Sequence, residues 1–292
     1  MRRVILTGDD FGLAVPVNEA IEEAHRHGVL TAASLMVGGA AAADAVERAR
    51  RLPSLRVGLH LVLVEGRPLL PAKAVPDLVD ASGELDTHLV RAGVRFFFKP
   101  GVRRQLEAEI RAQFQAFRAT GLPLDHVNAH NHVHLHPTVL RLLVQVGREF
   151  GMRAVRLPHE PPLVSWRAAG ASLWGRVGSA AFLWPWLALV RRSLRRAGLA
   201  HNQFLFGRND SGAMEEPLLR RLAAWLPDGV SEIYFHPATR RCPELDRNMP
   251  DYHNQQELAA LLSPAVRDAL RASGAQPIAF ADLGAGAAAG EG

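Results

Sequence analysis

Four histidines at alternate positions mark the stretch Asn128-Ala129-His130-Asn131-His132-Val133-His134-Leu135-His136-Pro137. Side chains point alternately to the two faces of a β-strand, so an extended backbone would place all four imidazoles on one face. The apolar residues Val127, Val133 and Leu135 favour a strand that runs out into a polar site. For an isolated cluster, a solvated histidine-rich loop is the alternative interpretation.

Three other polar residues occur in a similar sequence setting. Asp9 and Asp10 directly follow the apolar run Val4-Ile5-Leu6, and His60 lies inside the apolar segment 57–63. Each therefore lies in or just after a short run that is typical of a buried strand. Because α/β proteins gather functional groups at the carboxyl ends of parallel strands, these positions predict one shared site with the histidine run.

The whole chain alternates between strand-like and helix-like segments. The expected strands are 4–6, 32–37, 57–63, 124–127, 154–157, 204–206, 232–235 and 278–281. The expected helices are 17–27, 40–51, 103–120, 138–150, 215–226 and 255–272, with a Pro-rich connection at 66–100. Such repeated units predict an α/β fold, namely a single distorted TIM-like (β/α) barrel of seven or eight mainly parallel strands over residues 1–283. The Ala/Gly-rich tail 284–292 is predicted to be disordered.

A Trp- and Arg-rich helical insertion at about 160–200 interrupts this alternation. Its central part, 165–198, contains Trp166, Trp174, Trp184 and Trp186, followed by Arg191, Arg192, Arg195 and Arg196. No charged residue stands between Arg176 and Arg191, but this stretch is shorter than the ~20 residues that span a bilayer. Tryptophans beside a basic cluster predict peripheral membrane contact through 165–198. A helical pair that covers the barrel mouth is the other interpretation.

Composition excludes several classes of protein. The chain has 292 residues, 48% of them hydrophobic, which is enough for a large core. Its formal charge is +5, but the basic residues are nearly all arginines and no nucleic-acid-binding pattern occurs, so we expect no nucleic-acid partner. Cys242 is the only cysteine, which excludes an intrachain disulfide. Without a signal-peptide pattern, we expect a cytoplasmic protein, or one on the inner face of the cytoplasmic membrane.

The polar residues at the predicted strand ends suit a metal site. One carboxylate and two imidazoles form a three-ligand site for a divalent ion, with open positions for water and substrate. One of Asp9 and Asp10, together with His60 and His130, supplies that set. The other aspartate is then available as the general base on water. Zinc or magnesium is the expected metal, with manganese or iron as alternatives.

Later strands contribute further candidates. His236 ends the apolar strand Ile233-Tyr234-Phe235 and could protonate an amine leaving group. Arg156 ends another expected strand and could pair with the general base or bind substrate. We expect His132 and His134, on the predicted histidine face, to bind substrate as well.

Four blocks of the sequence resemble the YdjC/ChbG family of carbohydrate deacetylases. They are Thr7-Gly8-Asp9-Asp10-Phe11-Gly12, Gly58-Leu59-His60-Leu61, His130-Asn131-His132-Val133-His134 and Phe235-His236-Pro237-Ala238. The resemblance covers the chain up to about residue 160 and resumes after about residue 200. Family members commonly carry Ala in place of Gly8 and a third His in place of Asn131.

The resemblance implies a distorted β/α barrel that uses one divalent metal to remove N-acetyl groups from sugars. It implies that Asp10, His60 and His130 bind the metal. It also implies that Asp9 is the general base and that His236 is the general acid.

A narrower resemblance, to the hopanoid-biosynthesis branch HpnK, concerns the substrate. It rests on Arg91-Ala92-Gly93-Val94-Arg95-Phe96-Phe97-Phe98 and on the insertion at about 160–200. That branch is taken to deacetylate an N-acetylglucosaminyl hopanoid, so the resemblance implies a glycolipid substrate. A soluble chito-oligosaccharide is the alternative amino-sugar substrate. The sequence is compatible with a homodimer.

Other functional classes use similar residues. Barrel phosphoesterases place a His-x-His pair after the first strand, where this chain has Asp9 and Asp10. Iron oxygenases with two histidines and one carboxylate more often have a double-stranded β-helix than alternating β/α units. A non-catalytic carbohydrate- or lipid-binding protein on the same fold is a further alternative, against which the intact set of candidate residues argues.

Overall fold

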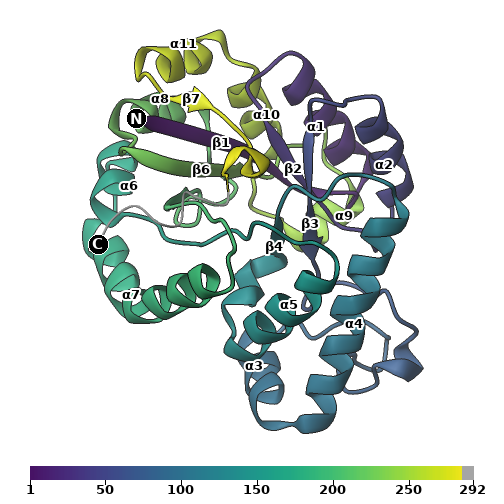
Figure 1. Cartoon of the computed structure of the whole chain (residues 1–292). Coiled ribbons are helices and arrows are strands. Elements are labelled where there is room, and N and C mark those ends of the chain that lie inside the picture. The colour runs from purple at the N-terminus through teal and green to yellow at the C-terminus, as the bar shows by residue number, and fades with distance from the viewer. Residues whose placement is uncertain (285–292) are drawn as a thin grey trace.

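A curled parallel sheet forms the centre of the molecule (Figure 1). The computed structural model describes residues 1–284. The sheet has seven strands in the order β4-β3-β2-β1-β6-β5, with β7 paired to β1, and every pairing is parallel. The strands are β1 Arg2–Phe11, β2 Ala32–Leu35, β3 Arg56–Leu61, β4 Val127–Ala129, β5 Phe204–Phe206, β6 Gly229–Phe235 and β7 Gln276–Pro277.

Helices surround the sheet (Figure 1). They are α1 Val15–Arg26, α2 Ala42–Arg50, α3 Leu89–Phe98, α4 Pro100–Ala119, α5 Pro137–Glu149, α6 Pro162–Ala169, α7 Leu173–Arg196, α8 Glu216–Trp225, α9 Pro243–Asn248, α10 Asn254–Leu262 and α11 Pro264–Ala272. The short 3-10 segments are η1 Ala72–Ala74, η2 His130–Leu135 and η3 Phe280–Asp282. Helical spacing of apolar residues explains their packing: in α4 it buries Leu106, Ile110, Phe114 and Phe117.

The predicted α/β fold with a parallel sheet is confirmed, but regular strands do not close the sheet into a barrel within residues 1–284. The expected strand 154–157 makes only two isolated bridges, one from Val155 and one from Ala154. The expected strand 278–281 is wrong, because β7 precedes it and the chain then turns into η3. Pro277 has no backbone N–H to donate to a neighbouring strand. Phe280 packs among the buried residues inside the curled sheet.

The extended conformation predicted for the histidine run is wrong. β4 ends at Ala129, where its pairing with β3 also ends, and the chain continues as η2. Within η2, Asn131 and His132 have left-handed backbones with φ of 52° each. An extended strand needs a hydrogen-bonded neighbour, and none is present beyond Ala129 in the described chain. The imidazoles therefore do not share one face.

Two helical regions also differ from expectation. The connection at 66–100 contains the unpredicted helix α3. The expected helix 255–272 is divided into α10 and α11 at Ser263. The Ser263 hydroxyl accepts backbone N–H groups at the start of α11, and Pro264 cannot continue the helix before it.

The insertion forms the helices α6 and α7. The indole N–H of Trp186 donates to the carbonyl of Leu135 at 2.8 Å, which attaches α7 to η2. Among residues 1–284, no helix is long and apolar enough to cross a membrane. The predicted disordered tail, apart from Gly284, lies outside the described residues.

The inside of the curl changes from apolar to polar along the strands. Near the amino ends, a small buried cluster consists of Ile5, Ala32, Ala154, Val230, Phe280 and Leu283. Two residues further along, Thr7 on β1 donates to Glu232 on β6 at 2.8 Å. Because every second residue of a strand points inward, the next inward positions are Asp9, His60, Asn128 and Tyr234. The fold thus brings polar side chains together at the carboxyl end of the sheet.

Candidate metal centre

Asp9 and Asp10 lie at the end of β1, where the strand is irregular. In a regular strand, neighbouring side chains point to opposite faces. Here the register with β2 shifts between Gly8 and Phe11, and Asp10 has a left-handed backbone with φ of 61°. Aspartate tolerates this conformation better than most residues. As a result, both carboxylates line the same pocket.

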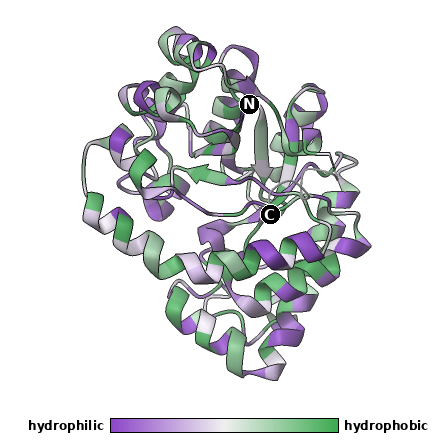
Figure 2. Cartoon of the chain, turned by 60° about the vertical axis from the view of Figure 1, so that its left-hand side comes forward, coloured by the Kyte–Doolittle hydropathy of each residue, from purple (hydrophilic) through white to green (hydrophobic). Residues whose placement is uncertain are grey.

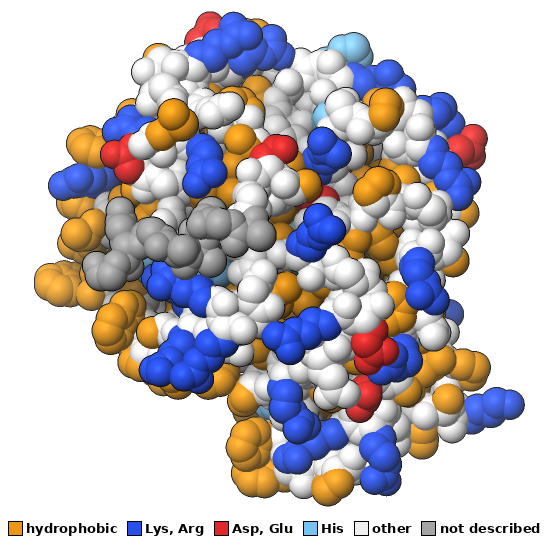
Figure 3. Space-filling model, in the orientation of Figure 1, with side chains coloured by type: hydrophobic (Ala, Val, Ile, Leu, Met, Phe, Trp, Pro, Cys, Tyr) orange, Lys and Arg blue, Asp and Glu red, His pale blue; other side chains and the backbone are white. Residues whose placement is uncertain are grey.

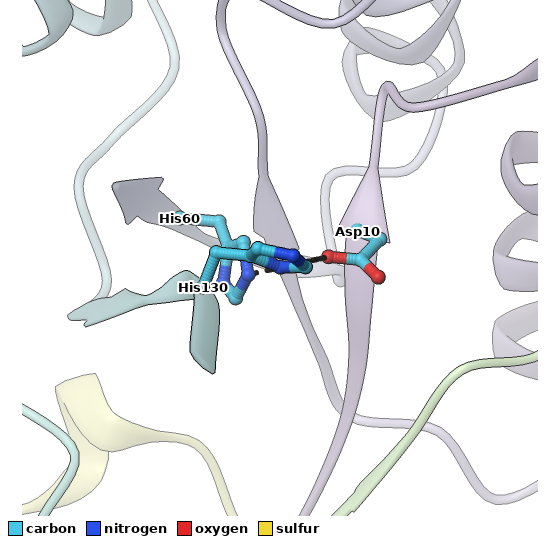
Figure 4. Close-up of side chains that lie close together, drawn as sticks. All are labelled: Asp10, His60 and His130. Atoms are coloured by element: carbon cyan, nitrogen blue, oxygen red, sulfur yellow. Dashed lines mark ion pairs between the residues drawn. The ribbon is translucent and has the colours of Figure 1, made fainter. Parts of the chain in front are cut away.

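Asp10, His60 and His130 come together in this pocket (Figure 4). They come from the end of β1, from β3 and from the start of η2. One ligand atom of each residue lies within 4.8 Å of the others. Oδ1 of Asp10 is 3.2 Å from Nε2 of His60 and 3.4 Å from Nδ1 of His130. The predicted cluster is therefore present in the structure, and its donor set suits one divalent ion.

Unpartnered buried atoms support the same fit. Both carboxylate oxygens of Asp10 and Nε2 of His60 are buried and make no hydrogen bond within the described residues. Buried polar atoms nearly always have a partner, so such exceptions require an explanation. Atoms of these types are metal ligands, and the side chains present fit a divalent ion.

Asp9 is held by Arg156 behind the pocket. The guanidinium donates to Oδ2 of Asp9 at 2.5 Å and to Oδ1 at 2.9 Å, and it also donates to Glu232. All three side chains are buried. Burial by itself raises the pKa of Asp9, but the positive charge of Arg156 outweighs it and holds that pKa well below its ordinary value. Asp9 is therefore ionised at neutral pH, and its orientation is fixed.

His236 follows β6 and lines the same pocket. Its backbone N–H donates to Glu257 at 2.5 Å, and its carbonyl accepts from Asn254 at 2.7 Å. The rings of Tyr234 and Tyr252 lie edge-on to the imidazole, with centroid distances of 5.5 and 5.1 Å. The hydrogen bonds fix the backbone of His236, and the two tyrosine rings pack against its imidazole.

A buried hydrogen-bond chain leads from His60 away from the metal centre. Nδ1 of His60 lies 2.7 Å from Oδ1 of Asn128, whose amide donates to Ser34 at 2.8 Å. The Ser34 hydroxyl lies 3.1 Å from Nε2 of His126, and Nδ1 of that ring lies 2.8 Å from Asp125. Because an ionised carboxylate only accepts, the consistent assignment points every donated proton toward Asp125. This assignment leaves Nε2 of His60 with its lone pair for the metal.

Gly58 makes room for this hydrogen-bond chain. A Cβ atom at Gly58 would lie 2.5 Å from Cε1 and 2.6 Å from Nδ1 of His126. Real Cβ atoms essentially never approach other atoms so closely. The glycine two residues before His60 therefore allows the His126 ring to pack against β3.

The pocket has a volume of about 240 Å³. Several residues that line it were not predicted from the sequence. These residues include Glu65, Arg208, Ser211, Asn248 and Tyr252. Oε2 of Glu65 lies 3.8 Å from Nε2 of His130 and accepts from Asn131 at 2.7 Å. Glu65 could have been predicted from the sequence, because it is a charged residue directly after the apolar run that contains His60. The others lie far along the chain, and no local pattern marks them.

The predicted substrate-binding residues lie at different depths. His132 lines the pocket, and its ring centroid is 5.5 Å from that of Tyr234. His134 and Arg156 are fully buried and do not line the pocket, so their predicted contact with substrate finds no support. Nε2 of His134 lies 3.0 Å from the Arg156 carbonyl, and burial lowers the pKa of His134 to about 4. The other role predicted for Arg156, pairing with Asp9, is present.

These observations define an α/β protein with a candidate divalent-metal centre at the carboxyl end of its sheet. Residues 3–272 match the family model described as YdjC-like protein. The chain therefore belongs to the YdjC-like family.

Curated relatives carry the name carbohydrate deacetylase. One from Mus musculus is 31% identical, and the match covers 96% of this chain and 94% of the relative. Relatives from Brevibacillus brevis and Geobacillus stearothermophilus are 40% and 39% identical over 53% and 56% of this chain. The two bacterial matches span 59% and 64% of those relatives' own length.

A solved structure supports the fold. It is a protein from Enterococcus faecalis V583 whose name refers to cellobiose-phosphate cleavage. It superposes with a TM-score of 0.74 at 23% sequence identity, covering 97% of this chain and 98% of that chain. The whole described fold is therefore shared with a known architecture.

Proposed function

We propose that this chain is a metal-dependent hydrolase that removes the N-acetyl group from an amino sugar. The observation that carries the proposal is a three-ligand cluster beside an ionised carboxylate and an imidazole in one pocket. Membership of the YdjC-like family and the name of the curated relatives point to the carbohydrate and the acetyl group.

In the proposed reaction, the residues of the pocket have separate roles. Asp10, His60 and His130 would hold the metal. When bound, a divalent ion supplies Lewis-acid polarisation of the acetyl carbonyl and lowers the pKa of water. Asp9 accepts a proton from the attacking water. His236 donates a proton to the amine nitrogen as the C–N bond breaks, so that acetate and the free amino sugar leave.

The space around the centre suits a substrate larger than one sugar. The metal pocket adjoins a second cavity of about 700 Å³, and the two share Glu65, His130 and Asn248 in their walls. Cavities of this size hold typical small ligands. We assign the acetylated sugar to the metal pocket and the remainder of the substrate to the adjoining cavity.

We further propose a glycolipid, N-acetylglucosaminyl hopanoid, as the substrate, with soluble chito-oligosaccharides as the alternative. The support is the resemblance of residues 91–98 and of the insertion to the hopanoid branch. Such a substrate would place the enzyme on the inner face of the cytoplasmic membrane through residues 165–198.

Acetate release by purified, zinc- or magnesium-loaded protein tests the proposal. Lipid-linked and oligosaccharide N-acetylglucosamine are compared, and mass spectrometry follows loss of the acetyl group. We expect turnover that Asp9→Asn lowers by roughly 10²–10⁴-fold and that Asp251→Asn, at an exposed aspartate, leaves unchanged. Turnover of the oligosaccharide alone would remove the lipid assignment. No turnover of either substrate by metal-loaded protein would contradict the deacetylase.

A further inference from the structure

No acidic residue occurs in segment 87–106, which includes α3, or in segment 161–209, which includes α6 and α7. Both segments also expose apolar side chains. On α3 and α7 the most exposed are Val90 at 82%, Phe98 at 70%, Trp174 at 83%, Phe182 at 84% and Trp184 at 64%. Apart from Met1, every large hydrophobic side chain of residues 1–284 that is more than half exposed lies on α3, α6 or α7. Apart from Met1, the large apolar side chains that are more than half exposed thus lie in these two segments.

The helices α3 and α7 contact the same short stretch of chain. Trp186 on α7 donates to the carbonyl of Leu135, and the ring centroids of Phe96 and Phe97 on α3 lie 5.8 and 6.3 Å from that of His136. This stretch is the end of η2, which begins with the candidate metal ligand His130. Figure 3 shows hydrophobic side chains together with Lys and Arg over both helices.

α3 reaches the wall of the metal pocket, and α7 lines a neighbouring cavity. Leu89, the first residue of α3, lines that pocket. Arg208 lines it too, and the same arginine lines the cavity beneath α7 together with Trp184. The exposed apolar surface therefore lies beside the route to the metal centre.

α7 exposes apolar side chains along its first turns and arginines along its last turns. Leu187, Val190 and Leu194 are buried against the protein, while Trp174 and Phe182 point outward. The exposed side of its last turns carries Arg192, Arg195 and Arg196, and Figure 2 shows this change from hydrophobic to hydrophilic along the helix. Apolar residues followed by arginines are typical of a helix that contacts anionic headgroups.

Basic side chains next to the apolar surface lack acidic partners. Lys99 and Arg104, just after α3, are exposed like the three arginines of α7. No ion pair within residues 1–284 involves any of these five side chains. Their charge is therefore available to an external anionic partner.

We propose that α3 and α7 form a single docking surface for an anionic lipid membrane, which holds the metal pocket at the boundary between lipid and water. The inference deepens the proposed function, because its purpose rests on a lipid-linked substrate. The absence of acidic residues decides between occupants. A second copy would bring one positive surface against another, whereas anionic headgroups neutralise that charge.

Vesicle binding by the full-length protein tests this surface. Flotation is measured with vesicles of phosphatidylcholine alone and of phosphatidylcholine with phosphatidylglycerol, at low and high salt. We expect binding only to the anionic vesicles, and weaker binding at high salt. The double variant Arg195→Glu, Arg196→Glu should weaken binding at least about tenfold, since each basic residue near the surface contributes separately.

Matched variants separate the parts of the surface. Trp174→Ser with Phe182→Ser tests the apolar face of α7, and Phe98→Ser tests α3; we expect each to weaken vesicle binding. The control Arg56→Glu with Arg271→Glu reverses two exposed charges on other elements and should leave binding unchanged. Unchanged binding by Phe98→Ser would overturn the two-helix surface.

Turnover of a soluble N-acetylglucosamine oligosaccharide, measured on the same samples, separates this proposal from the proposed function. Deacetylation without vesicle binding would overturn the docking surface and leave the enzyme intact. Vesicle binding without deacetylation of either this oligosaccharide or the lipid-linked substrate would overturn the enzyme and leave the docking surface. Light scattering tests for dimers. If the wild type were dimeric and the Arg195→Glu, Arg196→Glu variant monomeric, the surface would bind a second copy of the chain and not a membrane.

Discussion

The metal pocket and the docking surface on α3 and α7 differ from most proteins in opposite ways: charged side chains are buried at the first, and large apolar side chains are exposed at the second. Behind the pocket, Asp9, Arg156 and Glu232 carry charge although they are 2%, 0% and 0% exposed. On the docking surface, Trp174 and Phe182 are 83% and 84% exposed although they are aromatic. Burying charge and exposing large apolar groups are both unfavourable for a free, folded chain.

The difference lies in where the compensation comes from. Behind the pocket the chain supplies it, because Arg156 forms hydrogen bonds with both Asp9 and Glu232. On α3 and α7 the described chain supplies no cover for the aromatic side chains. An internally compensated region should therefore fail when one partner is removed, whereas the exposed region should tolerate substitution in the absence of its external partner.

The largest expected effect comes from removing a metal ligand. His60→Ala and Asp10→Asn should lose both bound metal and turnover, because a three-ligand site retains too few donors. Metal content and acetate release measure the two losses, and chelation of the wild type followed by zinc addition should reproduce and reverse them. His253→Ala, at an exposed histidine, is the matched control. A His60→Ala protein with normal metal content and normal turnover would show that these residues do not form the metal centre.

Asp9→Asn should separate metal binding from catalysis. We expect bound metal to remain and turnover to fall by roughly 10²–10⁴-fold, the usual contribution of a general base. Asp10→Asn should show the opposite order, with metal lost first. If the two variants exchanged these results, the roles of the two aspartates would be exchanged.

Arg156→Met should destabilise the fold by about 3–5 kcal/mol, because it leaves the carboxylates of Asp9 and Glu232 buried together without a cation. Urea unfolding measures the change. Arg271→Met, at an exposed position, should change stability by no more than about 0.5 kcal/mol. Equal effects from the two substitutions would show that the buried cation does not compensate the carboxylates.

The hydrogen-bond chain behind His60 should have a smaller effect, mainly on metal affinity. Ser34→Ala interrupts the chain between Asn128 and His126, and we expect metal binding about 10–100-fold weaker. Calorimetric titration with zinc measures it. Ser231→Ala is a close control, because Ser231 is also a buried strand serine but its hydroxyl has no partner within residues 1–284. Unchanged zinc affinity in Ser34→Ala would show that the hydrogen-bond chain does not contribute to metal binding.

The smallest effect is expected on the docking surface when lipid is absent. Trp174→Ser should change the free energy of unfolding by no more than about 0.5 kcal/mol. Trp186→Ser, in the same helix, should cost more, because Trp186 is partly buried and bonds Leu135. Thermal unfolding of the pair compares them directly. A large loss for Trp174→Ser would mean that α7 packs against the chain through its outer face.

The sequence predicted the grouping of the three candidate metal ligands better than the structure around them. Asp10, His60 and His130 could be grouped because each lies in or just after a short apolar run, and parallel strands bring their carboxyl ends together. The conformation of the histidine run could not be predicted, since an extended backbone depends on a neighbouring strand that ends at Ala129. That dependence is tertiary and leaves no local pattern.

Other features depended on contacts between distant segments. Ser34 and His126 are 92 residues apart, so nothing near either one indicates the hydrogen-bond chain. α3 was not predicted because it lies within the Pro-rich region 66–100, which was expected to be a connection. The Trp/Arg insertion was visible by composition, but only the structure separates the exposed Trp174 from the anchored Trp186.

The most direct test of the central claim is acetate release from N-acetylglucosamine substrates, measured while zinc or magnesium is titrated into metal-free protein. We predict that turnover rises in proportion to occupancy of one site per chain. Asp9→Asn should bind the same amount of metal, with turnover lowered by roughly 10²–10⁴-fold. Metal binding at one site with no acetate released from any N-acetylglucosamine substrate by the wild type would contradict the central claim.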